Sequence, residues 1–340
     1  MIFEDIKFLV LWVTGDCNLR CRYCYASDKT DKDYMSFEVA KKAIDLCNKK
    51  KIKLQLAGGE PLLNFNLIKE IYDYIKSNDI PAILQMQTNG SLIDEGIAQG
   101  IRDMRIAMGV SLDGPIDINE KLRGASSEVL NGIRLLKEVG VMLNLNCVVT
   151  DLNIDYLYQL IDIAYYLGNV GGVGLDLLRL TGRAIKDESK VKEASPKAIK
   201  DALKRAYLRS MEIEVISGRK IIIREIEEAK KRLKKPLKCS EYCHASYGGS
   251  AIVLPNGDLY PCGSLVGIEE YYMGNVLGDN IYKKIRVNNN ENIECKDCEY
   301  NPFCQGACPA RGITNNDGGI TEQDCMLRKA SFEIAKDCIH

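Results

Sequence analysis

Residues 17–25 read CNLRCRYCY, with three cysteines in eight positions directly after the predicted strand Lys7–Val13. Thiolates spaced Cys-x3-Cys-x2-Cys on one loop can converge on three corners of an iron–sulfur cubane, and the fourth iron then has no protein ligand in this loop. An open metal position can bind and polarise a small molecule. The alternative is a zinc loop completed by a distant residue, but this loop follows a strand, where barrels build active sites. We therefore predict Cys17, Cys21 and Cys24 as cluster ligands.

The composition indicates a cytoplasmic metalloprotein. The 340-residue chain has 46 Lys and Arg against 47 Asp and Glu, so no chain-wide field would attract nucleic acid or an anionic membrane. The longest apolar run, Phe8–Val13, is too short to span a bilayer, and the N-terminus lacks the features of a signal peptide. The chain has fourteen cysteines, and eleven of them gather in two clusters, which indicates metal binding rather than a disulfide framework.

The first half of the chain alternates apolar strands with amphipathic helices, which predicts a parallel α/β sheet. The predicted strands are Lys7–Val13, Lys53–Ala57, Ala82–Gln87, Arg105–Ser111, Val141–Thr150 and Gly174–Leu180. The predicted helices are Ser36–Lys50, Asn66–Ser77, Asp94–Arg102, Ser127–Val139, Ile154–Leu167 and Pro196–Glu212. Six such units predict a partial (β/α)6 TIM-like barrel, because a closed eight-fold barrel needs more chain.

Four segments make up the expected domain organisation: a barrel over 1–212, a bridging helix over 213–238, a cysteine-rich domain over 239–325 and a C-terminal helix over 326–340. The bridging helix has a basic bias, which we interpret as a solvated face; docking of an acidic peptide is the less favoured alternative. The segments Gly248–Leu254 and Asp258–Tyr260, joined by Pro-Asn-Gly, predict a β-hairpin.

With Tyr23 in its aromatic position, the loop of Cys17, Cys21 and Cys24 resembles that of the radical S-adenosylmethionine (SAM) superfamily. The resemblance implies that the open iron binds the amino and carboxylate groups of SAM. It further implies that an electron from the reduced cluster cleaves SAM to methionine and a 5′-deoxyadenosyl radical, which abstracts hydrogen from a substrate.

Further matches to this family follow successive predicted strands. Gly58-Gly59-Glu60-Pro61 resembles the motif for the SAM amino group, with glycines that permit close approach and a carboxylate for an ammonium ion. The resemblance implies ribose contacts for Ser111 and Asp113 and a SAM carboxylate contact for Arg123. A strand-end cap for Ser111 and a surface salt bridge for Arg123 are the structural alternatives.

Alternation along the fifth and sixth predicted strands suggests which side chains reach the interior. Asn144, Asn146 and Val148 share a face that we expect inside the barrel, where Asn146 would meet SAM or substrate. Cys147 then packs outward in the core, and Cys47 is likewise expected in the core. In the sixth strand Asp176 and Arg179 are expected on opposite faces, so that at most one reaches the cavity.

The C-terminal cysteines resemble the SPASM extension of peptide-modifying radical SAM enzymes, which holds two auxiliary 4Fe–4S clusters. Carrying the pattern over assigns the first cluster to Cys239, Cys243, Cys262 and Cys308, and the second to Cys295, Cys298, Cys304 and Cys325. Three 4Fe–4S clusters are therefore expected in all. Cys239 is the weakest assignment, and without it the first auxiliary cluster has an open iron. Two zinc ions are the alternative. Cys338 is expected to be structural.

The resemblance implies an oxidoreductase that modifies a peptide or protein, served by an electron donor such as ferredoxin or flavodoxin. Gly263 stands where sulfatase-maturing relatives carry a catalytic aspartate, so that activity is disfavoured. Because Cys17 comes early, we expect any leader-recognition protein to be separate. His244 is expected to support a metal ligand rather than carry protons. Thr181-Gly182-Arg183 favours the alternative of a haem-precursor substrate, and a non-enzymatic electron-transfer or zinc scaffold is a third hypothesis.

Overall fold

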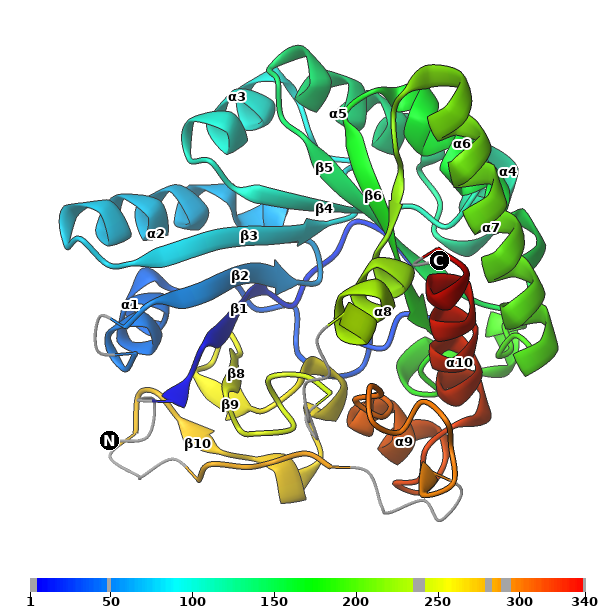
Figure 1. Cartoon of the computed structure of the whole chain (residues 1–340). Coiled ribbons are helices and arrows are strands. Elements are labelled where there is room, and N and C mark those ends of the chain that lie inside the picture. Colours follow the sequence, from blue (N-terminus) through cyan, green and yellow to red (C-terminus); the bar gives the residue numbers. More distant parts are fainter. Residues whose placement is uncertain (1–4, 48–49, 235–241, 279–282, 289–294, 339–340) are drawn as a thin grey trace.

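The computed structural model describes residues 5–47, 50–234, 242–278, 283–288 and 295–338. Its centre is one ten-stranded sheet in the order β10-β9-β8-β1-β2-β3-β4-β5-β6-β7 (Figure 1). Six parallel strands form the barrel wall: β1 (Phe8–Thr14), β2 (Ile52–Gly58), β3 (Ala82–Thr88), β4 (Ala107–Ser111), β5 (Leu143–Val149) and β6 (Val170–Leu177). The prediction of a partial TIM-like barrel is confirmed.

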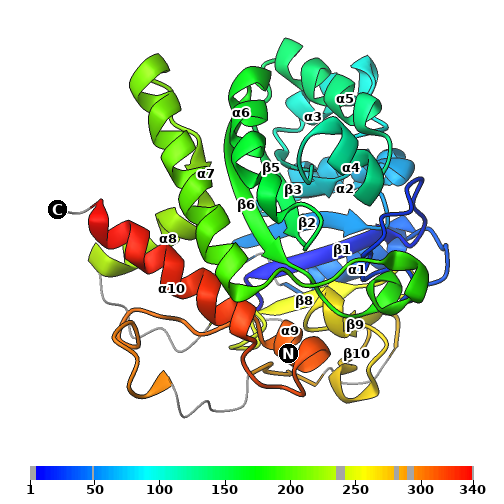
Figure 2. The same ribbon diagram turned by 90° about the vertical axis from the view of Figure 1, so that its right-hand side faces the viewer.

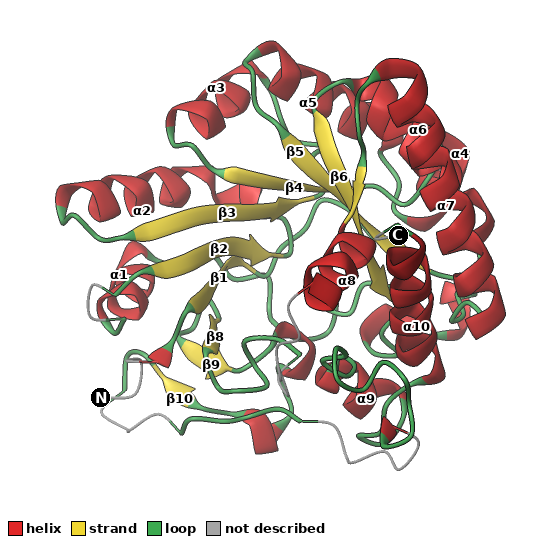
Figure 3. Cartoon of the chain, viewed as in Figure 1, coloured by secondary structure: helices red, strands yellow, loops and turns green. Residues whose placement is uncertain are grey.

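Helices cover the outer face of this wall (Figure 3). They are α1 (Phe37–Asp45), α2 (Phe65–Ser77), α3 (Glu95–Asp103), α4 (Ile116–Leu122), α5 (Ser126–Glu138), α6 (Leu157–Leu167) and α7 (Pro196–Ser217). Side-chain caps define where several helices begin. At α1 the Ser36 hydroxyl accepts a hydrogen bond from Val39 N–H, and at α3 the Asp94 carboxylate accepts one from Ile97 N–H. Alternate strand residues such as Leu9 and Leu11 are buried in the core between sheet and helices. The short helix α4 was not predicted.

β6 begins at Val170, so the predicted start at Gly174 is wrong. Glycines weaken a strand signal, yet two of them are needed here because other groups approach closely. A Cβ on Gly172 would lie 2.7 Å from the Ile222 carbonyl oxygen, and one on Gly174 would lie 2.5 Å from Arg224 Nη1. The strand also ends at Leu177, before the predicted end at Leu180.

The C-terminal region extends the same sheet (Figure 2). It contains β7 (Ile222–Ile223), α8 (Arg224–Lys234), β8 (Ser250–Val253), β9 (Asp258–Tyr260), β10 (Gly274–Asn275), α9 (Pro309–Asn315) and α10 (Glu322–Asp337). β8 and β9 form the predicted hairpin, and β8 also pairs in parallel with β1. α7 continues to Ser217, so the boundary expected after residue 212 falls inside a helix. α8 packs against β6 and α10.

Short 3-10 helices complete the described elements: Pro61–Asn64, Ile154–Tyr156, Gly182–Ile185, Asp187–Ser189, Gly263–Leu265 and Glu269–Tyr271. Within the described ranges, none of the helices has the length and apolar character required to cross a lipid bilayer.

Candidate active site

The loop of Cys17, Cys21 and Cys24, here called the cluster loop, lies against the end of β2. Gly59 N–H donates to the Thr14 carbonyl at 2.9 Å, and Glu60 N–H donates to the Asp16 carbonyl at 2.8 Å. A Cβ on Gly58 would lie 2.2 Å from the Thr14 carbonyl oxygen, and one on Gly59 would lie 2.0 Å from the Asp16 carbonyl oxygen. Only glycine leaves room for this contact, and Gly58 also has a φ of 136°.

Glu60 is fully buried and joins the ends of β2 and β3. Its Oε1 accepts from the Thr88 hydroxyl at 2.6 Å and Leu62 N–H at 3.1 Å, and its Oε2 accepts from Asn89 N–H at 2.7 Å. Burial raises the pKa of Glu60 to about 7, although these three donors favour the charged form. The carboxylate therefore braces two strand ends, and its expected contact with the SAM ammonium group stays a prediction.

The raised pKa of Glu60 predicts a pH effect on stability. Below pH 4.5, which is the ordinary pKa of a glutamate, the protonated Glu60 side chain contributes its full share to the stability of the folded protein. This contribution is lost as the pH rises through about 7, the pKa in the folded state. The loss is on the order of 3 kcal/mol. We expect the melting temperature of the wild-type protein to fall as the pH is raised from about 5 to about 7.5, and to fall further than that of the Glu60→Gln variant over the same range. Both proteins are measured in matched buffers. Parallel profiles for the two proteins would contradict the buried, protonated carboxyl.

The turn after β3 holds the first ligand position. Asn89 Nδ2 donates to Asn18 Oδ1 at 3.0 Å and lies 4.0 Å from Cys17 Sγ. Asn18 Nδ2 in turn donates to the Ser91 hydroxyl at 2.9 Å. The turn Thr88-Asn89-Gly90 therefore positions the cluster loop.

A buried ion pair holds the other side of the loop. Arg123 Nε donates to Asp113 Oδ2 at 2.8 Å and Arg123 Nη2 to Oδ1 at 3.1 Å. Oδ2 also accepts from the Tyr23 hydroxyl, and Oδ1 accepts from Val148 N–H at 2.9 Å. Asp113 has no exposed surface and positions Tyr23 and Arg123, and its expected contact with the SAM ribose stays a prediction. Arg123 is buried, which excludes the surface salt bridge considered for it.

The segment after β6 packs on the last cysteine of the loop. Arg183 N–H donates to the Cys24 carbonyl at 3.0 Å, and a Cβ on Gly182, whose φ is 60°, would lie 2.4 Å from the same oxygen. Packing against the cluster loop thus accounts for Thr181-Gly182-Arg183. This run gives no support to a haem-precursor substrate.

The three thiols suit an iron–sulfur cluster. All are half-buried, and burial raises the pKa of Cys17 and raises that of Cys21 to about 11; Arg123 partly offsets the effect on Cys21. The neighbouring Cys24 thiol contributes to both shifts, so the three groups lie close together. Iron would supply the positive charge that such thiolates need.

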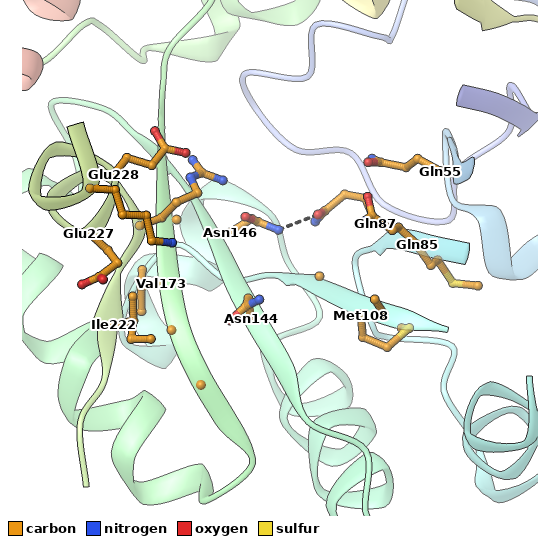
Figure 4. Close-up of a pocket in the computed structure, with 18 residues that line it drawn as sticks. Gln55, Gln85, Gln87, Met108, Asn144, Asn146, Val173, Ile222, Glu227 and Glu228 are labelled. Atoms are coloured by element: carbon orange, nitrogen blue, oxygen red, sulfur yellow. Dashed lines mark hydrogen bonds between the residues drawn. The ribbon is translucent and has the colours of Figure 1, made fainter. Parts of the chain in front are cut away.

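Polar side chains meet inside the barrel below the cluster loop. Gln87 of β3 donates to the Ser111 hydroxyl at 3.0 Å, and Asn146 of β5 donates to Gln87 Oε1 at 2.5 Å (Figure 4). This bond crosses β4 over Gly109, where a Cβ would lie 2.5 Å from Gln87 Oε1. Asn146 faces inward as predicted, and Cys147 is fully buried in the core.

These residues border a cavity of about 620 Å³, here called the amide cavity. Five carboxamide side chains line it: Gln55, Gln85, Gln87, Asn144 and Asn146. The three glutamines were not among the site residues predicted from the sequence. Their signal is the alternation of Gln85 with Gln87 in one predicted strand, which matches that of Asn144 with Asn146 in another.

The C-terminal cysteines form two groups. Burial raises the pKa of the Cys262 thiol, and the nearby Cys308 and Cys243 thiols raise it further. Burial also raises the pKa of Cys325, which lies close to three other thiols: Cys295, Cys298 and Cys304. These four border a cavity of about 500 Å³. The groups match the expected ligand sets, except that Cys239 lies outside the described residues. Cys338 belongs to neither group and lies on the surface.

Asp176 and Arg179 form an ion pair beside Tyr25, which follows the last cysteine of the cluster loop. The prediction of opposite faces is wrong because β6 ends at Leu177, and Arg179 Nη1 turns back to Asp176 Oδ2 at 2.5 Å. Burial alone would raise the pKa of Asp176, but Arg179 and Arg311 lower it to about 2. Arg179 also lies over the ring of Tyr25, 5.6 Å from its centroid.

Known proteins match most of this chain. The sequence profile of the Radical SAM superfamily matches residues 13–164. An uncharacterised protein of Methanocaldococcus jannaschii is 35% identical over 295 residues, which cover 84% of this chain and 93% of that protein. The cysteine-type anaerobic sulfatase-maturating enzyme of Clostridium novyi is 24% identical over 369 residues, which cover 97% of this chain and 95% of that enzyme.

Solved structures share the fold. anSMEcpe with bound AdoMet (SAM) has a TM-score of 0.80 at 21% identity, with 98% of each chain covered. Streptococcus suis SuiB bound to the precursor peptide SuiA has a TM-score of 0.68 at 18% identity, covering 95% of this chain and 76% of that chain. The matched profile spans the cluster loop together with the ends of β2 and β3 that hold it. This chain is an enzyme of the radical SAM superfamily.

Proposed function

We propose that this enzyme cleaves SAM reductively and abstracts hydrogen from a peptide or protein substrate. The observation that carries the proposal is the fixing of three close thiols by the carboxyl ends of β2, β3 and β6, beside a polar barrel interior. When bound, a reduced 4Fe–4S cluster supplies the electron that splits SAM into methionine and a 5′-deoxyadenosyl radical. Cys17, Cys21 and Cys24 would hold that cluster.

The protein's own groups have distinct roles around the cofactor. The backbone at Gly58 and Gly59 would receive the SAM ammonium group, with Glu60 holding this turn in place. Ser111 would bind the ribose, Arg123 the SAM carboxylate, and Asn146 the SAM or the substrate. Tyr23 would fix the loop through Asp113.

Two auxiliary 4Fe–4S clusters complete the proposal. The first would be bound by Cys243, Cys262 and Cys308, with Cys239 as the fourth ligand, and the second by Cys295, Cys298, Cys304 and Cys325. We further propose the divisions 1–212, 213–238, 239–325 and 326–340 of the chain, with the first boundary placed within α7. We also propose a cytoplasmic location, an electron donor such as ferredoxin or flavodoxin, and a separate leader-recognition protein.

A peptide substrate is supported by similarity, along most of the chain, to a sulfatase-maturating enzyme and to SuiB, which binds the precursor peptide SuiA. Sulfatase maturation itself is disfavoured at Gly263. A Cβ there would lie 3.2 Å from Trp12 Cζ2 and 3.3 Å from the Tyr25 hydroxyl, so an aspartate would need its neighbours to move.

The test is anaerobic incubation of the reconstituted protein with SAM and dithionite. We expect the wild-type protein to form 5′-deoxyadenosine, and Cys21→Ala to lose at least about 100-fold in rate, because a ligand of the reducing cluster is removed. Iron analysis should show about twelve irons per wild-type chain. Cys338→Ser is the matched control, since Cys338 is exposed and outside both thiol groups. No product from a fully loaded wild-type protein would contradict the proposal.

A further inference from the structure

A second cavity adjoins the amide cavity inside the barrel. It has a volume of about 1080 Å³, shares Gln85, Arg224, Glu228 and Lys231 with the amide cavity, and extends along α8 to Cys243. We call it the basic cavity. Sites for small molecules usually measure about 300–1,000 Å³, so the two cavities together exceed that range. Their size suits a polypeptide segment.

Positive charge dominates the basic cavity. Seven basic and three acidic side chains line it. Each carboxylate has an arginine partner: Asp176 with Arg311 at 3.1 Å, Glu225 with Arg224 at 2.7 Å, and Glu228 with Arg328 at 3.7 Å. The other four cations have no ion-pair partner among the residues that the structure describes; these are Lys53, Lys231, Arg232 and Lys234. The cavity therefore has an excess of positive charge.

Two arginines of this lining also have unused hydrogen-bond donors. Arg232 Nη1 and Arg328 Nε are buried without a partner. A buried donor that loses water without gaining an acceptor destabilises a protein, so each of these groups needs an acceptor, which a bound water or a ligand can supply. Glu225 Oε2 is likewise buried without a donor. Carboxylates would satisfy the arginines, and a peptide N–H would satisfy the glutamate.

The amide cavity has a different character. Its charged residues are balanced, with Arg224 and Lys231 against Glu227 and Glu228. Figure 4 shows these two glutamates on α8, across the interior from the carboxamides of Asn144 and Asn146. Carboxamides both donate and accept hydrogen bonds, as peptide groups do. The amide cavity therefore suits the uncharged main chain of a peptide, lying close to the proposed SAM site.

We infer that the substrate is an acidic peptide segment, whose Asp or Glu carboxylates bind in the basic cavity while its main chain lies along the amide cavity. The inference rests on the proposed function and names its substrate class. It also revises the interpretation of the basic helix, because Lys231, Arg232 and Lys234 line the cavity instead of forming only a solvated face.

The experiment measures binding of fluorescein-labelled peptides of about ten residues to the anaerobic holoenzyme by anisotropy. One peptide carries three glutamates, and its counterpart carries three glutamines. We expect the glutamate peptide to bind roughly tenfold more tightly, with an advantage that shrinks at high salt. Lys231→Glu should weaken its binding by roughly tenfold. Lys230→Glu is the matched control, because Lys230 lies on the same helix outside the cavity, over the Tyr207 ring; it should change binding less than about threefold.

Equal affinity for the two peptides, or equal effects of the two lysine variants, would overturn the inference. Tighter binding of a tetracarboxylic porphyrin, with displacement of the glutamate peptide, would also overturn it and return the substrate to the tetrapyrrole class. Formation of 5′-deoxyadenosine by the wild-type holoenzyme, measured in the same preparation, separates these outcomes from failure of the proposed function. If that product forms and peptides bind without preference for acid, only the substrate class is wrong.

Discussion

Gly59→Ala is expected to reduce 5′-deoxyadenosine formation by about 100-fold or more, because a displacement of about 1 Å at a reacting site costs about that much. The new methyl group would lie 2.0 Å from the Asp16 carbonyl oxygen, which is a backbone atom and cannot rotate away. Asp16 adjoins Cys17, so the shift reaches the first cluster ligand directly. The measurements are the rate of SAM cleavage and the iron content after reconstitution.

Gly96→Ala is the control for this change. Gly96 lies in α3, where a Cβ would meet only Asp94 Oδ1, at 3.4 Å. Helix propensity favours alanine over glycine by up to about 1 kcal/mol, so this variant should keep its activity and melt at the same or a higher temperature. Full iron content and an unchanged rate in Gly59→Ala would show that the glycine contact does not position the cluster loop.

The sequence predicted the barrel well because its strands and helices have clear periodicity. The misses occur where tertiary contacts override local signals. β6 begins four residues early because Gly172 and Gly174 give space to Ile222 and Arg224, and no local pattern reports such a contact. Asp176 and Arg179 were placed on opposite faces because the alternation was continued past Leu177, where the strand ends.

The candidate site shows the same division. Motif spacing identified the cysteines, Gly58 and Gly59, since cluster binding and the close backbone contact require these residue types in any surroundings. It did not reveal that Asp113 would be enclosed by Arg123, Tyr23 and Val148 N–H, because those contacts join β4, β5, α4 and the cluster loop. Burial and partner choice are properties of the assembled fold, and a sequence motif does not encode them by itself.

Asp113→Asn is expected to destabilise the protein by about 3 kcal/mol or more, because it leaves the Arg123 guanidinium buried without its counter-charge. Asp113 has no exposed side-chain surface and Arg123 has only 10% exposed, so water cannot replace the lost charge. Asparagine keeps the size of the side chain, which isolates the effect of charge from that of a cavity. The melting temperature of the holoenzyme should fall by roughly 5 °C or more.

Two further variants separate this effect from a general loss of ion pairs. Glu138→Gln removes the exposed partner of Arg134, whose side chain is 56% exposed, and should cost less than about 0.5 kcal/mol. Adding Arg123→Met to Asp113→Asn removes the unpaired buried charge and should recover part of the lost stability, as apolar replacements of buried pairs do. Equal losses of stability in Asp113→Asn and Glu138→Gln would contradict this prediction, as would the absence of any recovery in the double variant. Either result would mean that the buried charge pair Asp113–Arg123 is not what holds Tyr23 and the cluster loop in place.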